Sequence, residues 1–430
     1  MKKKVVYIGL SADILHEGHI NILKISAKLG DVTVGLLTDK AISTYKKFPH
    51  FKYKQRAIIL KGLKYVNNII PQDTLDYTKN LKIVKPDFLV HGDDWKKGIQ
   101  KKTREKALKA LKNWGGKLIE PKYTKNVSSS LIKKKIAEIG TTPDIRRSKL
   151  KRLMHAKDLV RIMESHNALT GLIIEKLNIT QNEKYFEFDG LWSSSLIDSV
   201  VRGKPDNQSV DYSTRILGLN EILDVTTKPL IFDADNGGRI EHLPYLIKSL
   251  DRAGISAIVL EDKIGLKKNS LFKDQSGVKQ DSVKKFCTKI SKSCNSKVSD
   301  DLMIVARVES LILGKGLKDA LRRAEAYSEA GADAILIHSK EKTPNEIFSF
   351  ANKFIKSKFN KPMISVPSTY SRTKESDLIK NGFKIVIYAN HFLRASYPAM
   401  LNTAKNILKY QRSFEAEKSI SSIKEILKLI

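Results

Sequence analysis

The first 140 residues alternate between short apolar runs and amphipathic stretches. Apolar runs lie at VVYIGL (5–10), DVTVGLLT (31–38), NNII (67–70) and DFLVHGDD (87–94). Helical patterns lie at INILKISAKLG (20–30), at QRAIILKGLKYV (55–66) and from Ser128 to Ile139. Strands that alternate with helices are typical of a doubly wound parallel sheet. The pattern therefore predicts an α/β domain over residues 1–140.

A second α/β region follows a break at GTTPDIRRSK, residues 140–149. Glycine and proline stop helices, so we expect a linker over residues 141–154 and a second domain over 155–430. Its eight short apolar runs are VRIME (160–164), YFEFD (185–189), LIFDA (230–234), AIVLE (257–261), MIVAR (303–307), AILIH (334–338), MISV (363–366) and IVIY (385–388). Eight strands, each with room for a helix after it, predict a (β/α)8 TIM-type barrel with its chemistry at the carboxyl ends of the strands.

The tail, residues 392–430, has a helical pattern. Ile423, Ile426, Leu427 and Ile430 recur at helical spacing. The simplest interpretation is packing in the core or against another subunit.

The charge raises nucleic-acid binding as an alternative, because the formal net charge is +32. The excess is mostly lysine and is scattered through every segment, whereas proteins that read nucleic acid favour arginine. We therefore expect no nucleic-acid partner. The alternative predicts salt-sensitive DNA retention that survives mutation of Asp206. With 41% hydrophobic residues the chain can form hydrophobic cores.

The compartment is indicated by cysteine use and by hydropathy. Cys287 and Cys294 share one predicted helix and form neither a disulfide framework nor a zinc spacing. The apolar run at residues 5–10 is too short for a signal peptide, and no window approaches the roughly 20 apolar residues of a membrane span. We expect a cytoplasmic protein with no membrane partner.

Polar side chains follow the predicted barrel strands, where a catalytic site is expected. They are Trp192, Ser193 and Ser194 after the second strand, Asp233 and Asp235 at the third, Glu261 and Asp262 at the fourth, Arg307 and Glu309 at the fifth, and His338 at the sixth. Acid, base, cation and hydroxyl groups therefore converge on one rim.

Three of these carboxylates, Asp233, Asp235 and Glu261, suit Mg²⁺ held partly through water; the alternative is a pair of helix caps and a surface acid. Arg307 ends an apolar strand and needs an anionic partner, either a substrate or Glu309. A histidine in the position of His338 either donates to a phosphoryl oxygen or is a satisfied structural residue.

Six segments together resemble the phosphoenolpyruvate mutases of the isocitrate lyase superfamily. They are WSSSL (192–196), GKPDNQS (203–209), DADNGG (233–238), EDKIGLKKNS (261–270), VARVES (305–310) and LIHSK (336–340). The resemblance covers the chain from about residue 155 to the end, and EDKIGLKKNS is its most specific segment. Lyases of this superfamily carry a catalytic cysteine in that region. Cys287 and Cys294 lie well beyond it, which disfavours a lyase.

The resemblance implies a role for each matching residue. Asp233 would bind Mg²⁺, with Asp235 and Glu261 acting through metal-bound water. Asp206 would lie beside the phosphoryl group, as a transient acceptor or as an orienting group. Substrate contacts are implied for Trp192, Ser193, Ser194, Ser195, Leu196, Lys267, Asn269, Ser270, Arg307 and His338, with Lys267 and Asn269 closing over the site. Ser195 stands where many relatives have glycine. We expect Lys263 and Lys268 to face solvent.

The implied activity is the interconversion of phosphoenolpyruvate and 3-phosphonopyruvate, a carbon–phosphorus bond-forming step in phosphonate biosynthesis. The alternative is a phosphonopyruvate hydrolase or another enzyme of the superfamily with a non-catalytic head. Asn269 favours the mutase, because relatives with other chemistry commonly vary there. The resemblance also implies a homotetramer that exchanges C-terminal helices.

The N-terminal half carries LHEGH (15–19) at the end of its first strand. Two imidazoles at the start of a helix suit the phosphates of a nucleoside triphosphate. With Tyr53 and Arg56 as Y-x-x-R, HGDDW (91–95) and VSSSLIKKKI (127–136), this half resembles the cytidylyltransferases that act on glycerol phosphate and related alcohols.

This second resemblance implies a Rossmann-like nucleotidyltransferase domain with CTP as co-substrate. The implied contacts are His16 and His19 on the α-phosphate, Lys46 or Lys47 and Arg56 on phosphates, and Asp93, Ser128 and Ser129 on the nucleotide. Ala12 and Lys122 depart from the family pattern, which leaves the acceptor open. The alternative is a degenerate head kept for assembly. A fused pair suggests that the head attaches CMP to a phosphonate later in the same route.

Overall fold

The computed structural model describes residues 3–96, 100–122, 140–182, 184–265, 267–270, 272 and 274–430. They form two compact units. The first holds the N-terminal part up to residue 139 with residues 155–157 and 178–186. The second holds residues 140–154, 158–177 and 187–430. None of the described helices combines the length and the apolar character that crossing a membrane requires.

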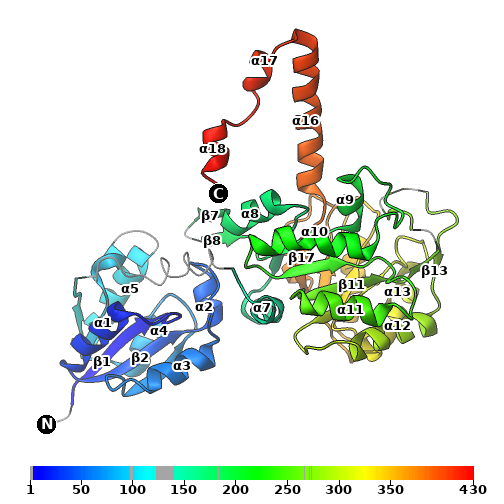
Figure 1. The fold of residues 1–430 in the computed structure, drawn as a ribbon. Coiled ribbons are helices and arrows are strands. Elements are labelled where there is room, and N and C mark those ends of the chain that lie inside the picture. The colour runs from blue at the N-terminus through cyan, green and yellow to red at the C-terminus, as the bar shows by residue number, and fades with distance from the viewer. Residues whose placement is uncertain are drawn as a thin grey trace. The chain divides into compact units, whose positions relative to one another are not determined.

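The first unit is built on a parallel five-stranded sheet in the order β3-β2-β1-β4-β5 (Figure 1). Its elements are β1 (Val5–Leu10), α1 (Glu17–Ala27), β2 (Asp31–Leu37), α2 (Asp39–Ser43), α3 (Tyr53–Lys61), β3 (Asn68–Gln72), α4 (Thr78–Val84), β4 (Phe88–Val90), the 3-10 helix η1 (Asp93–Lys96), α5 (Lys101–Lys112) and β5 (Lys117–Ile119). The strand order reverses at β1, the position at which doubly wound sheets bind ligands. The predicted fold class is confirmed for this unit.

The second unit contains a closed barrel of eight parallel strands, which confirms the predicted barrel. The strands are β6 (Val160–Glu164), β9 (Gly190–Ser193), β10 (Leu230–Asp233), β11 (Ala257–Glu261), β14 (Met303–Val308), β15 (Ala334–Ile337), β16 (Met363–Ser365) and β17 (Phe383–Tyr388). Pairing of β17 with β6 closes the ring. Two short hairpins, β7 (Asn178–Gln181) with β8 (Lys184–Glu187) and β12 (Lys263–Ile264) with β13 (Lys279–Gln280), lie outside it.

Helices follow the barrel strands. They are α8 (Ala168–Lys176), α9 (Ser195–Val200), α10 (Tyr212–Asp224), α11 (Leu243–Arg252), α12 (Val283–Asn295), α13 (Gly316–Glu329), α14 (Asn345–Phe354) and α15 (Glu375–Lys380). The apolar side of α12 illustrates why they form: Phe286 and Ile290 are buried one turn apart in the barrel's main apolar cluster. The tail adds α16 (His391–Tyr410), α17 (Phe414–Glu417) and α18 (Ile423–Leu427).

One predicted barrel strand is wrong. The run YFEFD (185–189) contributes mainly to the β7–β8 hairpin, and the second barrel strand is GLWS, β9. β9 is buried throughout, whereas β8 is only partly buried. Gly190 is required there, because a Cβ atom at that position would lie 2.6 Å from Ile162 and 2.8 Å from the backbone oxygen of Pro229.

The segment expected to be a linker is largely helical. Helix α7 (Pro143–Ala156) covers most of it. Arg146 on this helix is 3% exposed and donates to the backbone oxygens of Leu223 (2.7 Å) and Thr226 (2.6 Å). Arg147 pairs with the buried Asp251 at 2.7 Å. The helix is therefore fastened to the barrel unit.

The C-terminal helices have little contact with the barrel core. None of the twenty residues of α16 is buried, and Figure 1 shows this helix extending from the barrel. Its start is fixed by Glu164 at the end of β6, which accepts hydrogen bonds from the backbone nitrogens of Phe392 (2.8 Å) and Leu393 (3.2 Å). Ile423 and Leu427 of the predicted apolar stripe are 76% and 61% exposed, so it packs into no core within the described chain.

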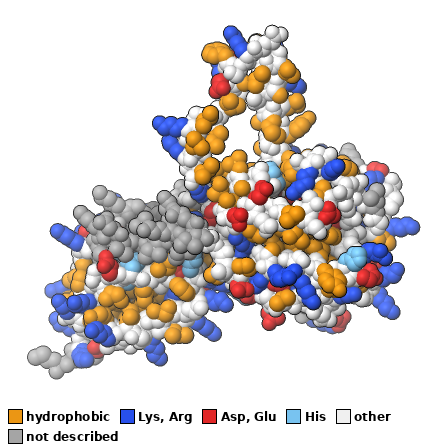
Figure 2. Space-filling view, viewed as in Figure 1, with side chains coloured by type: hydrophobic (Ala, Val, Ile, Leu, Met, Phe, Trp, Pro, Cys, Tyr) orange, Lys and Arg blue, Asp and Glu red, His pale blue; other side chains and the backbone are white. Residues whose placement is uncertain are grey.

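Basic side chains are spread across the face of the molecule shown in Figure 2 and do not gather in one patch. This distribution agrees with the interpretation of the charge as a general excess of lysine.

Candidate active site

The carboxyl ends of the barrel strands surround a cavity of about 70 Å³. Eleven of the residues singled out from the sequence line it: Trp192, Ser194, Ser195, Leu196, Asp233, Glu261, Lys267, Asn269, Ser270, Arg307 and His338. They come from separate strands and from the segment after β11. The barrel topology therefore brings together groups that are scattered along the sequence.

Lys267 is the centre of one cluster beside this cavity. Its Nζ atom lies 2.7 Å from Oδ1 of Asp206 and 2.5 Å from Oδ1 of Asp235, and it also donates to the hydroxyl of Ser195. Asn269 donates from Nδ2 to the other oxygen of Asp206 at 2.8 Å. Both oxygens of Asp206 are thus held by side chains of the EDKIGLKKNS segment.

Asp233 is held from the side of α9. Oδ2 of Asp233 accepts a hydrogen bond of 2.8 Å from the hydroxyl of Ser195 and one of 3.4 Å from its backbone nitrogen. Both the backbone and the side chain of Ser195 therefore contact Asp233. Ser193, in contrast, is not among the residues that line the cavity, and its hydroxyl donates to Asp198 at 3.1 Å.

A second cluster is organised by Ser270. Its hydroxyl accepts from Lys263 (2.6 Å) and Arg307 (2.8 Å) and donates to Glu309 (2.9 Å). Arg307 also donates to Glu309 at 2.5 Å. Arg307 is therefore paired with Glu309 within the protein.

The expectation that Lys263 faces solvent is wrong. Its side chain is 4% exposed and lies 3.2 Å from Glu309. Two buried carboxylates, Glu261 and Glu309, supply the negative charge that makes burial of an ammonium group tolerable. Lys268 is 30% exposed and pairs with Asp274.

Two buried nitrogen atoms in the cavity wall have no hydrogen-bond partner among the described residues. They are Nε1 of Trp192 and Nδ1 of His338. Burial and the nearby Arg307 lower the pKa of His338 to about 4, so its imidazole is neutral at pH 7. Buried polar groups are nearly always satisfied in folded proteins. These two atoms therefore indicate where a polar ligand would bind.

The carboxylates around the cavity differ in acidity. Burial raises the pKa of Glu261 to about 7, although Lys263 and Arg307 oppose the shift. Burial alone would also raise the pKa of Glu309, but Arg307 and Lys263 outweigh it and lower the value to about 2. The pKa of Arg307 lies above its usual range because these carboxylates outweigh its burial. Arg307 is therefore a permanent cation in the cavity wall.

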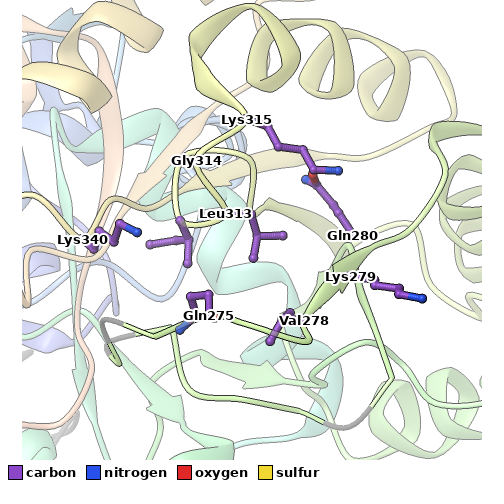
Figure 3. A pocket seen from close by; sticks show the side chains of 9 residues that line it. Gln275, Val278, Lys279, Gln280, Leu313, Gly314, Lys315 and Lys340 are labelled. Atoms are coloured by element: carbon purple, nitrogen blue, oxygen red, sulfur yellow. The ribbon is translucent and has the colours of Figure 1, made fainter.

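A larger hollow of about 510 Å³ lies beside the β12–β13 hairpin and contains none of the predicted site residues (Figure 3). Its lining comes from residues 275–280, from Ile312 to Lys315 and from Lys340. Its lysines are exposed, and the groups that carry chemistry lie in the smaller cavity. We therefore assign the active site to the smaller one.

Sequence reasoning missed several residues around the site. Asn390 and Ser368 line the cavity after the eighth and seventh strands, and the rule of strand ends that selected the others would have found them. Arg215 on α10 is 2% exposed and lies 3.7 Å from Asp235. No pattern along the sequence marks it.

The barrel is similar to known enzymes over most of its length. The family model described as phosphoenolpyruvate phosphomutase matches residues 150–408. A phosphoenolpyruvate phosphomutase from Tetrahymena pyriformis is 38% identical over 285 residues, covering 66% of this chain and 90% of the relative.

The chain belongs to the phosphoenolpyruvate phosphomutase family. It is therefore an enzyme of the wider superfamily that also contains isocitrate lyase, as the sequence predicted. A phosphonopyruvate hydrolase from Variovorax sp. (strain Pal2) is nearly as similar, at 36% identity over 63% of this chain and 90% of the relative.

Solved structures of this family agree with the barrel. A phosphoenolpyruvate phosphomutase from Streptomyces platensis subsp. rosaceus has a TM-score of 0.61 and 33% identity, covering 66% of this chain and 94% of that one. A phosphonopyruvate hydrolase in complex with oxalate and Mg²⁺ has a TM-score of 0.58 and 32% identity, covering 67% and 95%.

The head of this phosphomutase-family chain matches a second family model, described as cytidylyltransferase-like, over residues 7–135. Its candidate site lies where β1 leads into α1. His16 caps α1 and accepts a hydrogen bond from the backbone nitrogen of Gly18 (3.2 Å), and the rings of His16 and His19 lie 4.0 Å apart. The paired histidines therefore meet at a helix N-terminus, as their spacing predicted.

Burial together with the nearby His16 and Lys46 lowers the pKa of His19 to about 3, so its ring is neutral near pH 7. Burial also lowers the pKa of Lys46 to about 8, although Asp13 opposes the shift. Lys46 donates to the hydroxyl of Ser11 at 2.8 Å. A lysine and two imidazoles thus share the end of β1.

Arg56 does not join this cluster as a free cation. Its side chain is fully buried and donates to the backbone oxygens of Ser11 (2.5 Å) and Leu37 (2.8 Å) and to Asp39 (2.6 Å). These hydrogen bonds connect helix α3 to the chain at the ends of β1 and β2. Asp93 begins η1 after β4. Ser128 and Ser129 lie outside the described residues.

Proposed function

We propose that the barrel is a phosphoenolpyruvate mutase that transfers the phosphoryl group of phosphoenolpyruvate from the enol oxygen to C3, giving 3-phosphonopyruvate. The observation that carries the proposal is the meeting of Lys267 and Asn269 on the two oxygens of Asp206, beside a cavity walled by Arg307 and His338. The relative at 38% identity supports the same reaction.

The chemistry explains the need for an enclosed site. Breaking the P–O bond leaves the enolate of pyruvate, and the same enolate then forms the new bond from C3 to phosphorus. No atom is gained or lost. Water would protonate the enolate or capture the phosphoryl group, so the segment carrying Lys267 and Asn269 must exclude it during the transfer.

Side chains of this protein can stabilise the negative charges of the substrate in this reaction. Arg307, held as a cation by Glu309, offers positive charge to the substrate carboxylate. Nε1 of Trp192 is a hydrogen-bond donor that no described residue satisfies, and the neutral imidazole of His338 can offer one ring N–H to a phosphoryl oxygen. Asp206 orients the phosphoryl group or accepts it transiently.

Mg²⁺ is the cofactor that fits this acidic rim. Asp233, Asp235 and Glu261 are buried, and Glu261 is a carboxyl group that a nearby divalent cation would keep ionised. Among the described residues no three acidic, histidine or cysteine side chains lie close enough together to hold a metal ion by themselves, so water or substrate would have to complete its coordination. Mg²⁺ bound there would supply positive charge for the carboxylate and enolate oxygens.

The main alternative is phosphonopyruvate hydrolysis, because a hydrolase is almost as similar in sequence. The mutase is favoured by the hydrogen bonds to both oxygens of Asp206. Asn269 supplies one of these hydrogen bonds, and relatives with other chemistry commonly vary at that position.

Phosphorus NMR of the wild-type protein with Mg²⁺ and phosphonopyruvate tests this choice. We expect phosphoenolpyruvate to appear. Accumulation of pyruvate and inorganic phosphate in its place would show that the enzyme is a hydrolase.

We further propose that the head transfers CMP from CTP to a phosphonate or a phosphate alcohol. The cytidylyltransferase-like match and the cluster of His16, His19 and Lys46 support this activity. With CTP and candidate phosphonates the protein should release pyrophosphate, and His16→Ala should abolish the release while leaving the barrel reaction intact. Release at an unchanged rate in that variant would remove the paired histidines from the mechanism.

The proposed enzyme is cytoplasmic and works as a homo-oligomer, with residues 1–140 and 155–430 as its two functional domains. Support for assembly comes from the tail, where Met400, Leu408 and Ile423 are 61%, 79% and 76% exposed. Light scattering should give a multiple of 48.5 kDa. Replacing Met400 and Leu408 by glutamate should then lower the measured mass.

A further inference from the structure

Arg215 is a buried cation that none of the roles above requires. It lies on α10, is 2% exposed and stacks on the ring of Phe232 at 4.2 Å. Its Nε donates to Asp198 at 2.8 Å, but neither terminal nitrogen has a hydrogen-bond partner among the described residues. Leaving two donors of a buried guanidinium unpaired costs free energy, so we expect Arg215 to have a role other than stabilising the fold.

The purpose is indicated by where the guanidinium points. One terminal nitrogen, Nη1, lies 3.7 Å from Oδ2 of Asp235, while Oδ1 of the same carboxylate is 2.5 Å from Lys267. Asp235 therefore lies between two cations. Arg215 comes from a helix of the barrel, whereas Lys267 comes from the segment that closes the cavity. Arg215 itself is not part of the cavity lining.

A neighbouring residue on α10 fastens the same segment. Tyr212, one turn before Arg215, donates its hydroxyl to the backbone oxygen of Ala234 at 2.7 Å. The backbone at Asp235 has φ +49, a conformation that side-chain-bearing residues seldom adopt. Tyr212 and Arg215, from one turn of α10, thus contact Ala234 and Asp235, where the backbone has this unusual conformation.

We propose that Arg215, assisted by Tyr212, is a positioning residue that holds Asp235 in the orientation in which it meets Lys267. The inference rests on the proposed function, because it concerns the same cavity. Without Arg215 the carboxylate of Asp235 loses one of its two neighbouring cations, and residues 233–238 become more mobile. The closing segment then docks on a surface that is less well ordered.

Amide hydrogen exchange of the intact protein without substrate tests the proposal directly. Arg215→Met keeps the length of the side chain and removes its charge. We expect exchange in a peptide covering residues 232–238 to rise about tenfold, with a smaller rise in Tyr212→Phe and in Arg215→Lys. In phosphonopyruvate turnover, kcat of Arg215→Met should fall about tenfold or more while KM changes less than about threefold.

The matched control is Arg146→Met, which removes another buried arginine of the same unit. Arg146 donates to the backbone oxygens of Leu223, Thr226 and Lys228, and none of its hydrogen bonds within the described part of the chain reaches residues 233–238. This variant should lower the melting temperature without altering exchange in residues 232–238. Equal exchange changes in the two variants would show general loosening and overturn the positioning role.

Two further outcomes are decisive. Arg215→Met with wild-type exchange and wild-type kcat would also overturn the proposal; if that variant does not fold, Tyr212→Phe and Arg215→Lys decide in its place. Since exchange is measured without substrate, a wild-type protein that hydrolyses phosphonopyruvate or leaves it unchanged would refute the mutase proposal alone. The exchange comparison would still decide the role of Arg215.

Discussion

Nζ of Lys267 lies 2.7 Å from Oδ1 of Asp206, although 61 positions separate the two residues in the sequence. Their side chains are only 8% and 10% exposed. Lys267 follows β11 and Asp206 lies between α9 and α10, so the pair joins two loops beside the cavity. Breaking a buried pair leaves one charge without compensation, which is more damaging than losing a surface contact.

Lys267→Met should therefore reduce kcat for phosphonopyruvate at least about 100-fold. Lys268→Met is the matched control, because Lys268 is the next residue of the same segment but is 30% exposed and pairs with Asp274. We expect it to stay within about twofold of wild type. Both rates are measured by phosphorus NMR. Comparable losses in the two variants would contradict the placement of Lys267 in the site.

His338 predicts a dependence of stability on pH. Burial and Arg307 depress its pKa from 6.5 in the unfolded chain to about 4 in the folded chain. The contribution of His338 to the free energy of unfolding is thus fully present above pH 6.5 and is lost as the pH falls towards 4. Its size is about 3 kcal/mol at most.

The check is urea unfolding at pH 7.5 and pH 5. His338→Asn should shrink the difference between the two midpoints, whereas replacement of His155, which is exposed on α7, should preserve it. An undiminished difference in His338→Asn would assign the effect to other groups.

Ser270 connects three buried charged side chains. Ser270→Ala should destabilise the barrel by about 2 kcal/mol and lower kcat, because Lys263, Arg307 and Glu309 each lose a hydrogen bond. Ser276→Ala changes an exposed serine of the same region and should leave both unchanged. Urea unfolding and turnover measure the two effects. A Ser270→Ala protein as stable as the control would show that the three charges are satisfied without the hydroxyl.

Substitution of Arg56 distinguishes a structural role for this residue from a role in binding phosphates. Arg56→Met should destabilise the head by about 3 kcal/mol, since four backbone or carboxylate acceptors lose their donor in a buried site. The control is Lys54→Met, an exposed change on the same helix. Circular dichroism melting and CTP titration distinguish the roles. Weakened CTP binding with unchanged stability would restore Arg56 as a phosphate ligand.

Much of the barrel could be predicted from the sequence, because strands buried on both faces read as short apolar runs. AIVLE and MIVAR illustrate this, since β11 and β14 occupy these runs and are buried almost throughout. The strand GLWS escaped prediction because it contains a glycine required by close packing and a serine at its end. The neighbouring YFEFD has a stronger strand pattern but forms mainly a half-exposed hairpin.

The site was predictable where its residues follow strands and unpredictable where burial depends on a partner. Asp233, Arg307 and His338 could be found by their place after apolar runs. Lys263 could not, since its burial depends on Glu309, which comes from the next strand of the ring. The same holds for Arg215, whose partners Asp198 and Asp235 lie on helix α9 and in the segment after β10.

The hydrogen bonds from Phe392 and Leu393 to Glu164 have a consequence for synthesis of the chain. Glu164 ends the first barrel strand, and its donors lie 228 and 229 positions later. During synthesis these backbone donors are added only after more than 200 further residues have followed Glu164, since 228 positions separate Phe392 from it. The pairing of β17 with β6 is subject to the same delay. The ring therefore closes only after these later residues have been made, whereas the sheet of the head can form while the barrel is still being synthesised.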